Sequence, residues 1–405
     1  MYIFYFFAVV VLWLGVLSLR GGFRFARYVE QESAKPLTQF TPFVSVIAPF
    51  RGLDQGLSEN FSSLFNQSYP NYELIFVIDS LEDPALAVVE ELGRRKLHDG
   101  PVQTRILCAG RATDSGQKVH NLRVAVEQLD ARSEVLVFVD SDARPGPAWL
   151  KTLVAPLADS NVGAASGYRW FIPTNGSFAA HLRSVWNASI TSALGADSTR
   201  NFCWGGSTAI RRSTFEDLKI AQRWKGTVSD DFTMTGALQQ AHLPINFVPM
   251  CIVPSIETCN FREMLEFTNR QLKITRVYAP HLWRPLLIGS LLFCGVFFGG
   301  LVMLAIAALQ GEFSWLLAAL LMTIFILGAV KSFIRLRAIT IPLQRYEREL
   351  DRSILAHLFL WPLASFIYLM NATVAAFSRR IEWRGITYEL KSPNQAVIIR
   401  SSTQN

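Results

Sequence analysis

The chain has 405 residues, a net charge of +7 and 50% hydrophobic residues. No Gly-rich phosphate loop of the GxGxxG or GxxxxGK type occurs, which argues against a dinucleotide or ATP site of those kinds. No nucleic-acid-binding motif accompanies the positive charge, so we expect no nucleic-acid partner. The five cysteines are odd in number and not closely paired, and we expect no disulfide framework.

The apolar residues gather at the two ends of the chain. Residues 1–19 contain no charge, and about 20 apolar residues are enough to cross a bilayer core. The basic start and small-residue cleavage site of a signal peptide are missing, so we interpret this run as a retained anchor. Three more apolar runs, at 285–309, 313–330 and 354–377, predict membrane segments. The predicted organisation is an anchor at 1–19, a soluble domain at 20–284 with an interfacial helix near 261–283, membrane segments at 285–378 and a tail at 379–405.

Basic residues beside these runs orient the chain through the positive-inside rule. They predict a multi-pass protein of the cell membrane with a cytoplasmic soluble domain, and they fit anionic lipid headgroups. The run at 354–377 either crosses the membrane or forms a re-entrant hairpin kinked at Pro362, which leaves the tail inside; we favour the hairpin. The basic residues are Arg20, Arg24, Arg27, Arg284, Lys331, Arg335, Arg337, Arg345, Arg348, Arg352, Arg379, Arg380 and Arg384.

Short apolar runs alternate with helical segments in the soluble domain. This alternation predicts an α/β fold with an open, mostly parallel sheet and helices on both faces. The predicted strands are 44–50, 72–79, 104–110 and 135–142, and predicted helices between them include 57–67 and 84–97. Ligands of such sheets bind outside the carboxyl ends of the strands. The polar residues at these ends are Arg51, Asp54, Asp79, Arg111, Lys118, Asp140 and Asp142.

The stretch "VLVFVDSDARPG" places Asp140 and Asp142 one residue apart at a predicted strand end. Aspartates favour turns, because their side chains hydrogen-bond to nearby backbone groups. Alternatively, the two carboxylates bind a divalent cation, since Mg²⁺ is commonly held by one or two carboxylates plus substrate phosphates. Taken alone, the stretch is equally consistent with a turn and with a metal site.

Three further polar stretches each allow a structural and a functional interpretation. Asp230 and Asp231 start a predicted helix, either as favourable charges at its N-terminus or as a general base. Lys118 and Asn121 lie near the start of another predicted helix. They are either polar residues on the protein surface or part of a ligand pocket. The stretch at 269–283 mixes cations with aromatics, either as a snorkelling interfacial helix or to neutralise a diphosphate.

Several of these stretches occur together in one known family. The segment "VSVIAPFRGLDQGLSENFSSLFNQSYPNYELIFVIDSLEDPAL" resembles the opening of ceramide-glucosyltransferase-type enzymes. The resemblance continues through "GQKVHNL", "VFVDSDARP", "CWGGSTAIRRSTFEDL" and "SDDF" and covers roughly 44–278. It implies an inverting, nucleotide-sugar-dependent glycosyltransferase of the family 2/21 type with the GT-A fold, which is a Rossmann-like α/β fold.

The resemblance implies a membrane-bound hexosyltransferase with a UDP-sugar donor, glucose or N-acetylglucosamine, and with Mg²⁺ or Mn²⁺. Asp79 would contact the uracil, and Asp142 would hold the metal on the diphosphate. Asp140 would contact the donor sugar or ribose, and it would also bind the metal together with Asp142. The other donor-binding candidates are Arg51, Lys118, Asn121, Arg270, Gln271, Lys273 and Arg276.

The acceptor implied by the resemblance is a lipid hydroxyl at the membrane interface. Asp231, the second acid of the catalytic pair with Asp230, would be the general base. The acceptor hydroxyl would attack the anomeric carbon opposite UDP and invert its configuration. The residues on the acceptor side would be Trp204, Gly205 and Gly206.

The chain departs from the family pattern in two places. Ceramide-specific members often lack the second acid of the DxD motif, whereas this chain keeps Asp142. The (Q/R)xxRW motif has Lys273 first and Val277 last, although Arg276 keeps its place. Ceramide, a hopanoid or other polycyclic lipid, and a diacylglycerol therefore all stay open as acceptors.

Two other functions remain as alternatives. A processive polysaccharide synthase would be expected to carry more membrane spans for an export channel, and its product would not dissolve in organic solvent. A non-catalytic membrane protein that keeps the fold would not release UDP. The joint presence of Asp79, Asp140, Asp142 and Asp231 argues against the non-catalytic alternative.

Overall fold

The computed structural model describes residues 2–94, 101 and 103–401. The chain forms two compact units, each assembled from separate segments. The helical unit consists of Met1–Glu30, Asn175–Ser192 and Thr258–Ser378. The sheet unit consists of Gln31–Thr174, Ala193–Glu257 and Arg379–Asn405, so the C-terminal tail belongs to the same unit as the main sheet.

The sheet unit is built on a seven-stranded sheet with the strand order β3-β2-β1-β4-β6-β5-β7. Only β6 runs against its neighbours, and all other pairings are parallel. This confirms the predicted α/β fold with a mostly parallel sheet. The strands are β1 (Val44–Pro49), β2 (Tyr72–Ile78), β3 (Gln103–Cys108), β4 (Val135–Phe138), β5 (Ala164–Ile172), β6 (Thr208–Arg211) and β7 (Ile245–Ile256).

Helices cover this sheet, and apolar side chains fill the space between them. One core cluster joins Ile47, Leu136 and Phe138 of the strands to Trp224 and Leu238 of the helices. The predicted helix at 84–97 is α3, which begins at Leu86 after a turn at 84–85 and ends at Arg94, and residues 95–97 lie outside the described part. The helices are α2 (Leu57–Phe65), α3 (Leu86–Arg94), α4 (Gln117–Val126), α5 (Trp149–Val154), η1 (Ala155–Ala158), α7 (Arg212–Asp217), α8 (Ile220–Arg223) and α9 (Asp230–Gln240).

The central strands β2, β1 and β4 end side by side. β1 pairs in parallel with β2 on one side and with β4 on the other. The three strands are completely buried and apolar at almost every position, as expected for parallel strands covered on both faces. The chain therefore leaves the sheet at one common edge, where the Ser141 hydroxyl donates to Asp54 Oδ2 at 2.7 Å.

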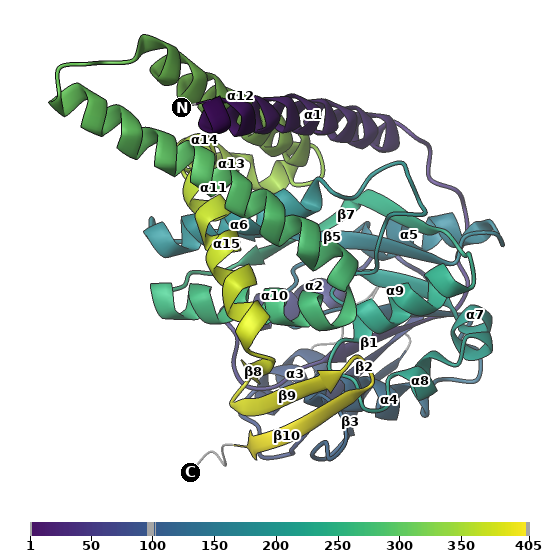
Figure 1. The fold of residues 1–405 in the computed structure, drawn as a ribbon. Coiled ribbons are helices and arrows are strands. Elements are labelled where there is room, and N and C mark those ends of the chain that lie inside the picture. Colours follow the sequence, from purple (N-terminus) through teal and green to yellow (C-terminus); the bar gives the residue numbers. More distant parts are fainter. Residues whose placement is uncertain (1, 95–100, 102, 402–405) are drawn as a thin grey trace. The chain divides into compact units, whose positions relative to one another are not determined.

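The tail folds into a second, antiparallel sheet with the order β10-β9-β8. Its strands are β8 (Arg380–Trp383), β9 (Ile386–Ser392) and β10 (Gln395–Ser401). Ile381, Ile386, Tyr388 and Leu390 are buried, so one face of this small sheet is packed. Figure 1 shows β9 and β10, in yellow, beside α4, where the Tyr388 hydroxyl accepts a hydrogen bond from the backbone amide of Gln117.

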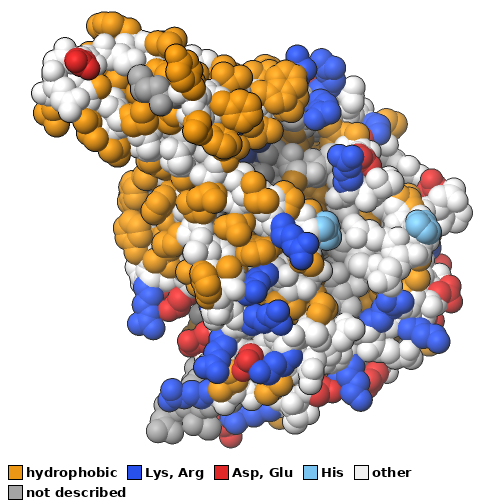
Figure 2. All heavy atoms as spheres, in the orientation of Figure 1, with side chains coloured by type: hydrophobic (Ala, Val, Ile, Leu, Met, Phe, Trp, Pro, Cys, Tyr) orange, Lys and Arg blue, Asp and Glu red, His pale blue; other side chains and the backbone are white. Residues whose placement is uncertain are grey.

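The helical unit contains three helices that are long and apolar enough to cross a membrane: α1, α11 and α12. Ala8 and Val11 of α1 pack with Phe297 of α11 and Leu321 of α12. Large apolar side chains cover the outer surface of these helices (Figure 2), with Ile288 as an example at 66% exposed. The elements are α1 (Tyr2–Ser33), α6 (Phe178–Thr191), α10 (Phe261–Tyr278), α11 (Pro280–Leu309), α12 (Trp315–Thr340), η2 (Gln344–Tyr346), α13 (Glu347–Arg352), α14 (Ile354–Phe359) and α15 (Trp361–Phe377).

The last apolar run is broken into two helices near Pro362. Helix α14 ends at Phe359, and Pro362 lies in the first turn of α15, where its missing N–H costs no intrahelical hydrogen bond. Helix α15 has 17 residues and packs with α6 and α10 through a cluster that includes Trp186, Leu272 and Ala372. The break therefore lies where the sequence predicted a kink.

Candidate active site

Lys118 connects two of the predicted acidic motifs. Its ammonium Nζ lies 2.7 Å from Asp140 Oδ1 and 3.1 Å from Asp230 Oδ2. Lys118 comes from the first turn of α4, Asp140 follows β4 and Asp230 starts α9. Burial lowers the pKa of Lys118, but the negative charges of Asp140 and Asp230 outweigh this and raise it above its usual value. The lysine therefore stays protonated and holds the two acids together.

Arg169 of β5 bridges the two carboxylates of the DSD stretch. Its guanidinium Nη1 donates to Asp142 Oδ2 at 2.9 Å, and Nη2 donates to Asp140 Oδ2 at 3.4 Å. Burial opposes ionisation of Asp140, but Lys118 and Arg169 hold its pKa below the usual value. For Asp142, burial raises the pKa, and the charge of Arg169 only partly offsets this. The two acids thus share a cation but differ in their tendency to ionise.

The DSD pair fits a divalent cation. Among the described residues, Asp142 Oδ1 is buried and accepts no hydrogen bond. No group of three or more His, Cys, Asp or Glu side chains in the described part is arranged around a metal position. Two carboxylates with one open oxygen suit Mg²⁺ or Mn²⁺ bound together with phosphate oxygens, because Mg²⁺ rarely uses an all-protein cage.

The stretch Trp204-Gly205-Gly206 lies against the same acids. A Cβ atom on Gly205 would be 2.7 Å from Lys118 Nζ and closer still to Asp230 Oδ2, and one on Gly206 would be 2.8 Å from Asp140 Oδ2. The indole of Trp204 lies 5.0 Å from the guanidinium carbon of Arg169. A side chain at Gly205 would displace Asp230 and Lys118, and one at Gly206 would displace the Trp204 ring and Asp140.

Asp230 and Asp231 have different surroundings at the start of α9. Ser229 caps the helix, and its hydroxyl also donates to Asp231 Oδ1. The backbone amide of Phe232 donates to the same oxygen at 2.7 Å. Asp230 is 4% exposed, whereas Asp231 is only partly buried. The predicted helix start is confirmed, and Asp231 is the more accessible acid of the pair.

Arg51 and Asp79 meet at the ends of β1 and β2. Arg51 Nε lies 3.5 Å from Asp79 Oδ2, and Arg51 Nη1 is buried with no hydrogen-bond partner among the described residues. Asn121 is fully engaged below them: its Oδ1 accepts from Gln117 at 2.8 Å, and its Nδ2 donates to the Val77 carbonyl at 3.4 Å. Asn121 therefore supports this edge of the sheet, while Arg51 has a donor to offer a ligand.

The predicted basic segment belongs to the helical unit. Arg270, Gln271, Lys273 and Arg276 all lie on α10. Arg276 donates to the carbonyl of Ala375 in α15, and the guanidinium of Arg270 lies 5.6 Å from the centre of the Phe267 ring. The role of these four residues toward a donor stays a prediction.

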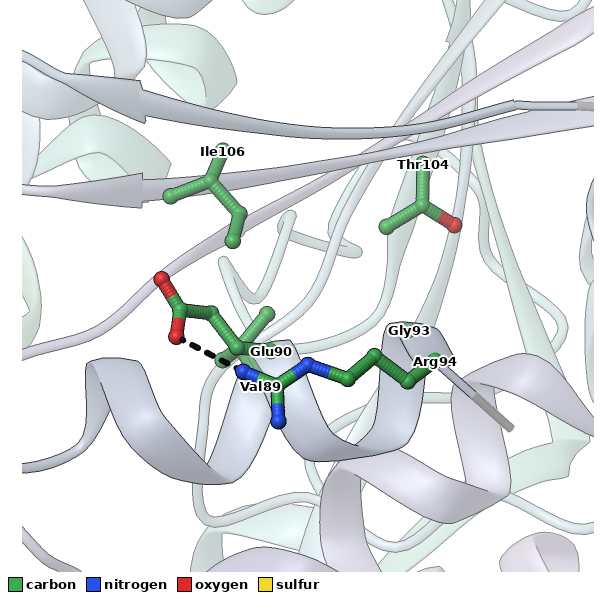
Figure 3. A pocket seen from close by; sticks show the side chains of 6 residues that line it. All are labelled: Val89, Glu90, Gly93, Arg94, Thr104 and Ile106. Atoms are coloured by element: carbon green, nitrogen blue, oxygen red, sulfur yellow. Dashed lines mark hydrogen bonds and ion pairs between the residues drawn. The ribbon is translucent and has the colours of Figure 1, made fainter.

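A surface pocket between α3 and β3 is separate from this site. It is lined by Val89, Glu90, Gly93, Arg94, Thr104 and Ile106. Figure 3 shows the ion pair between Arg94 and Glu90 at its rim, with 3.5 Å between Nη2 and Oε2. It contains none of the predicted site residues, and β3 is one of the two edge strands of the sheet.

Sequence reasoning missed two cations that the structure places at the acids. Arg169 lies within the apolar stretch "GYRWFI", where a charged residue in a buried strand was the available signal. Arg384 lies in the tail stretch "WRG", and its guanidinium contacts Asp54 at 2.7 Å. The sequence assigned Arg384 a part in membrane orientation and gave its tail stretch no role at the acids.

A family comparison matches nearly the whole chain. The model described as Glycosyl transferase family 21 matches residues 3–396. The chain belongs to glycosyl transferase family 21. The DSD stretch, the tryptophan–glycine loop and the Asp230–Asp231 pair all lie within the matched part of this family 21 chain.

Curated relatives match a shorter stretch of the family 21 chain. Ceramide glucosyltransferase 1 of Caenorhabditis elegans is 34% identical over 100 residues, which cover 25% of this chain and 20% of that protein. Ceramide glucosyltransferase of Komagataella phaffii is 29% identical over 102 residues, which cover 24% and 19%. The matches thus span about a fifth of these relatives' length.

Solved structures show more distant similarity. The mannosyltransferase PcManGT from Pyrobaculum calidifontis, in complex with GDP-Man and Mn²⁺, has a TM-score of 0.46 and 16% identity, with coverage of 91% of this chain and 98% of that one. GalNAc-T7 with UDP, GalNAc and Mn²⁺ has a TM-score of 0.41 and 16% identity, with coverage of 55% and 45%.

Proposed function

We propose that this family 21 chain transfers a hexose from a UDP-sugar to the hydroxyl group of a membrane lipid, with inversion at the anomeric carbon. One observation supports this most strongly. Lys118 joins Asp140 of the DSD stretch to Asp230 of the catalytic pair, so two motifs 90 residues apart contribute to one site. A site with both motifs has separate groups for a donor diphosphate and for an acceptor hydroxyl.

The donor side of the proposal rests on Arg51, Asp79 and the DSD pair. Asp79 accepts from the uracil, and the unpaired Nη1 of Arg51 donates to the nucleotide. Asp142 and Asp140 would hold Mg²⁺ or Mn²⁺, which when bound would supply positive charge to stabilise the diphosphate leaving group. Arg169 keeps the two carboxylates oriented. Arg276 of the basic segment adds charge at the leaving group, as the family resemblance implies.

The acceptor side rests on Asp231. Asp231 lies at the start of α9, where the Phe232 amide fixes its Oδ1, and it is less buried than Asp230, so an acceptor hydroxyl can approach it. Asp230 is engaged by Lys118 and holds the helix start in place. Asp231 therefore takes the proton of the acceptor hydroxyl as that oxygen attacks the anomeric carbon.

The membrane helices explain a lipid acceptor and suggest an orientation. A hydroxyl at the interface reaches a soluble site while the lipid tails stay in the bilayer. The tail follows α15 directly and folds with the sheet unit, which supports the predicted re-entrant form of α15. With α1, α11 and α12 crossing, basic residues at their ends favour a cytoplasmic sheet unit and a re-entrant α15.

The purified protein tests this proposal when it is mixed with UDP-glucose or UDP-N-acetylglucosamine, Mn²⁺ and a lipid extract. Released UDP is measured, and labelled product is extracted into organic solvent. Asp231→Asn should lower turnover by roughly 10²- to 10⁴-fold, which is the usual contribution of a general base, while UDP still binds. The matched control is Asp197→Asn, because Asp197 is an exposed aspartate of the same unit.

Each outcome separates one part of the proposal. If the wild-type protein binds no nucleotide sugar, the enzyme assignment is wrong. If Asp231→Asn turns over at nearly the wild-type rate, another group is the base. A labelled product that stays in the aqueous phase as a polymer would identify a polysaccharide synthase instead.

A further inference from the structure

The turn between β8 and β9 presents a charged side chain to the candidate active site. Arg384 adopts a positive φ of 53°, and Gly385 follows with a φ of 74°. Positive φ is unfavourable for a residue with a Cβ and is found where the surrounding structure stabilises it. This backbone conformation therefore points to a specific arrangement of the turn.

Arg384 contacts the loop that follows β1. Its Nη2 lies 2.7 Å from Asp54 Oδ1 and donates to Oδ2 at the same distance, and its Nη1 donates to the Arg51 carbonyl at 2.9 Å. Asp54 in turn accepts from Ser141, the central residue of the DSD stretch. The tail is thus one hydrogen-bonded side chain away from the proposed metal ligands.

The charge of Arg384 acts on the same acids. Burial lowers the pKa of Arg384, but its hydrogen bond to Asp54 and the charges of Asp54, Asp142 and Glu257 raise it above the usual value. The positive charge of Arg384 also contributes to the low pKa of Asp140, after the larger effects of burial, Lys118 and Arg169. Arg384 is therefore a permanent cation at the carboxyl edge of the sheet.

Two other contacts join the tail sheet to the start of α4, which carries Lys118, and to the loop before α9, which begins with Asp230. The Tyr388 hydroxyl accepts from the Gln117 amide at 3.1 Å, directly before Lys118. The Ala396 amide donates to the Gly226 carbonyl at 2.8 Å, in the loop that leads to α9. The small sheet therefore contacts three loops of the site.

We propose that Arg384 is a donor-binding residue whose guanidinium contacts the diphosphate of the UDP-sugar, so that the C-terminal sheet is part of the catalytic site. This rests on the proposed function. A guanidinium has five N–H donors in a planar fork suited to phosphate, and the contacts with Asp54 and Arg51 leave donors for a ligand. Its side chain is 37% exposed, so a ligand can reach it.

The test compares how Arg384→Gln changes the binding of UDP and of uridine to the full-length protein in Mn²⁺, measured by calorimetry. Losing a charged hydrogen bond to phosphate should weaken UDP binding roughly 10- to 100-fold, with uridine binding unchanged. Arg384→Lys, which keeps the charge but not the fork, should fall in between. Arg380→Gln is the control, because Arg380 lies on the same small sheet and its exposed side chain pairs with Glu389 at 3.8 Å.

Asp54→Asn separates ligand binding from a purely structural role. If Arg384 contacts phosphate, removing the charge of its protein partner leaves UDP binding intact or stronger. If Arg384 only positions Asp54, Asp54→Asn and Arg384→Gln weaken UDP binding equally, and the inference is wrong. An unchanged ratio of UDP to uridine affinity in Arg384→Gln also overturns it while leaving the proposed function standing. If the wild-type protein binds no UDP, both fall.

Discussion

Two pairs of aspartates meet in the candidate site, and their surroundings differ. Asp140 and Asp142 follow a strand, and the guanidinium of Arg169 contacts both. Asp230 and Asp231 start a helix. Asp230 forms an ion pair with Lys118, whereas Asp231 accepts hydrogen bonds from the Ser229 hydroxyl and the Phe232 amide. The first pair thus shares the guanidinium of Arg169. In the second pair, Asp230 is buried and paired with Lys118, and Asp231 is more exposed.

Under the proposed function, this difference gives the two motifs different chemistry. The two carboxylates of the first pair converge on one guanidinium, and Asp142 keeps an oxygen without a hydrogen bond for the proposed Mg²⁺ or Mn²⁺. The two carboxylates of the second pair have different partners, so Asp230 is held by Lys118 while the less buried Asp231 is the proposed base. The comparison makes separate predictions for the two pairs.

The largest expected effect is a loss of turnover whose dependence on Mn²⁺ differs between the two aspartate pairs. Asp142→Asn should lower turnover by roughly 10²- to 10³-fold, the cost of losing one preorganised electrostatic stabiliser, and should raise the Mn²⁺ concentration needed for half-maximal rate. Asp231→Asn should leave that concentration unchanged, because Asp231 is proposed to contact the acceptor. Rates measured over a Mn²⁺ titration check this, and equal shifts in both variants would contradict the division.

A smaller effect is expected where the tryptophan–glycine loop contacts the second pair. In Gly205→Ala the new Cβ overlaps Asp230 and Lys118, so their ion pair must shift. We expect turnover to fall roughly 10- to 100-fold, since overlap in a packed site costs about 1–3 kcal/mol. The control is Gly236→Ala on α9, where a Cβ has open space. Wild-type turnover in Gly205→Ala would show that the loop yields without cost.

The smallest effect concerns pH. Burial raises the pKa of Asp230 to about 6, so its ion pair with Lys118 is present above that pH and is lost as the pH falls through it. Turnover should decline below about pH 6. The native state holds this proton more tightly than the unfolded chain, so protonation of Asp230 alone favours folding as the pH falls from 6 towards 3.8.

Lowering the pH is thus expected to reduce turnover while protonation of Asp230 favours the folded state, and these opposite effects make the prediction specific. Turnover should fall between pH 7 and pH 5 without a matching drop in melting temperature. In Asp230→Asn the remaining turnover should lose this pH dependence. A melting temperature that falls together with turnover would assign the effect to unfolding and not to the ion pair.

The sequence predicted the sheet well because the evidence is local. Continuous apolar runs predicted β1, β2 and β4, and the acids after them do lie at one edge. Asp230 was expected at a helix start and is there. Which roles these residues have is not tested by the fold, so Asp79, Asp142 and Asp231 remain predictions as donor, metal and base residues.

The two cations that were missed depend on contacts far apart in the sequence. Arg169 reaches the DSD pair because antiparallel β6 lies between β4 and β5, and no local pattern reveals this insertion. Arg384 lies 330 residues from Asp54 along the chain. Local periodicity shows which residues form a strand or helix, but it does not show which distant loop the element contacts.

The position of the tail in the sequence has a consequence for biosynthesis. Arg384 and Tyr388 follow every apolar helix, so they are the last contributors to the candidate site to leave the ribosome. Domains fold as units once their segments have been synthesised. The sheet unit is therefore incomplete until α11, α12 and α15 have been made, and the order of translation links completion of the active site to the synthesis of its membrane helices.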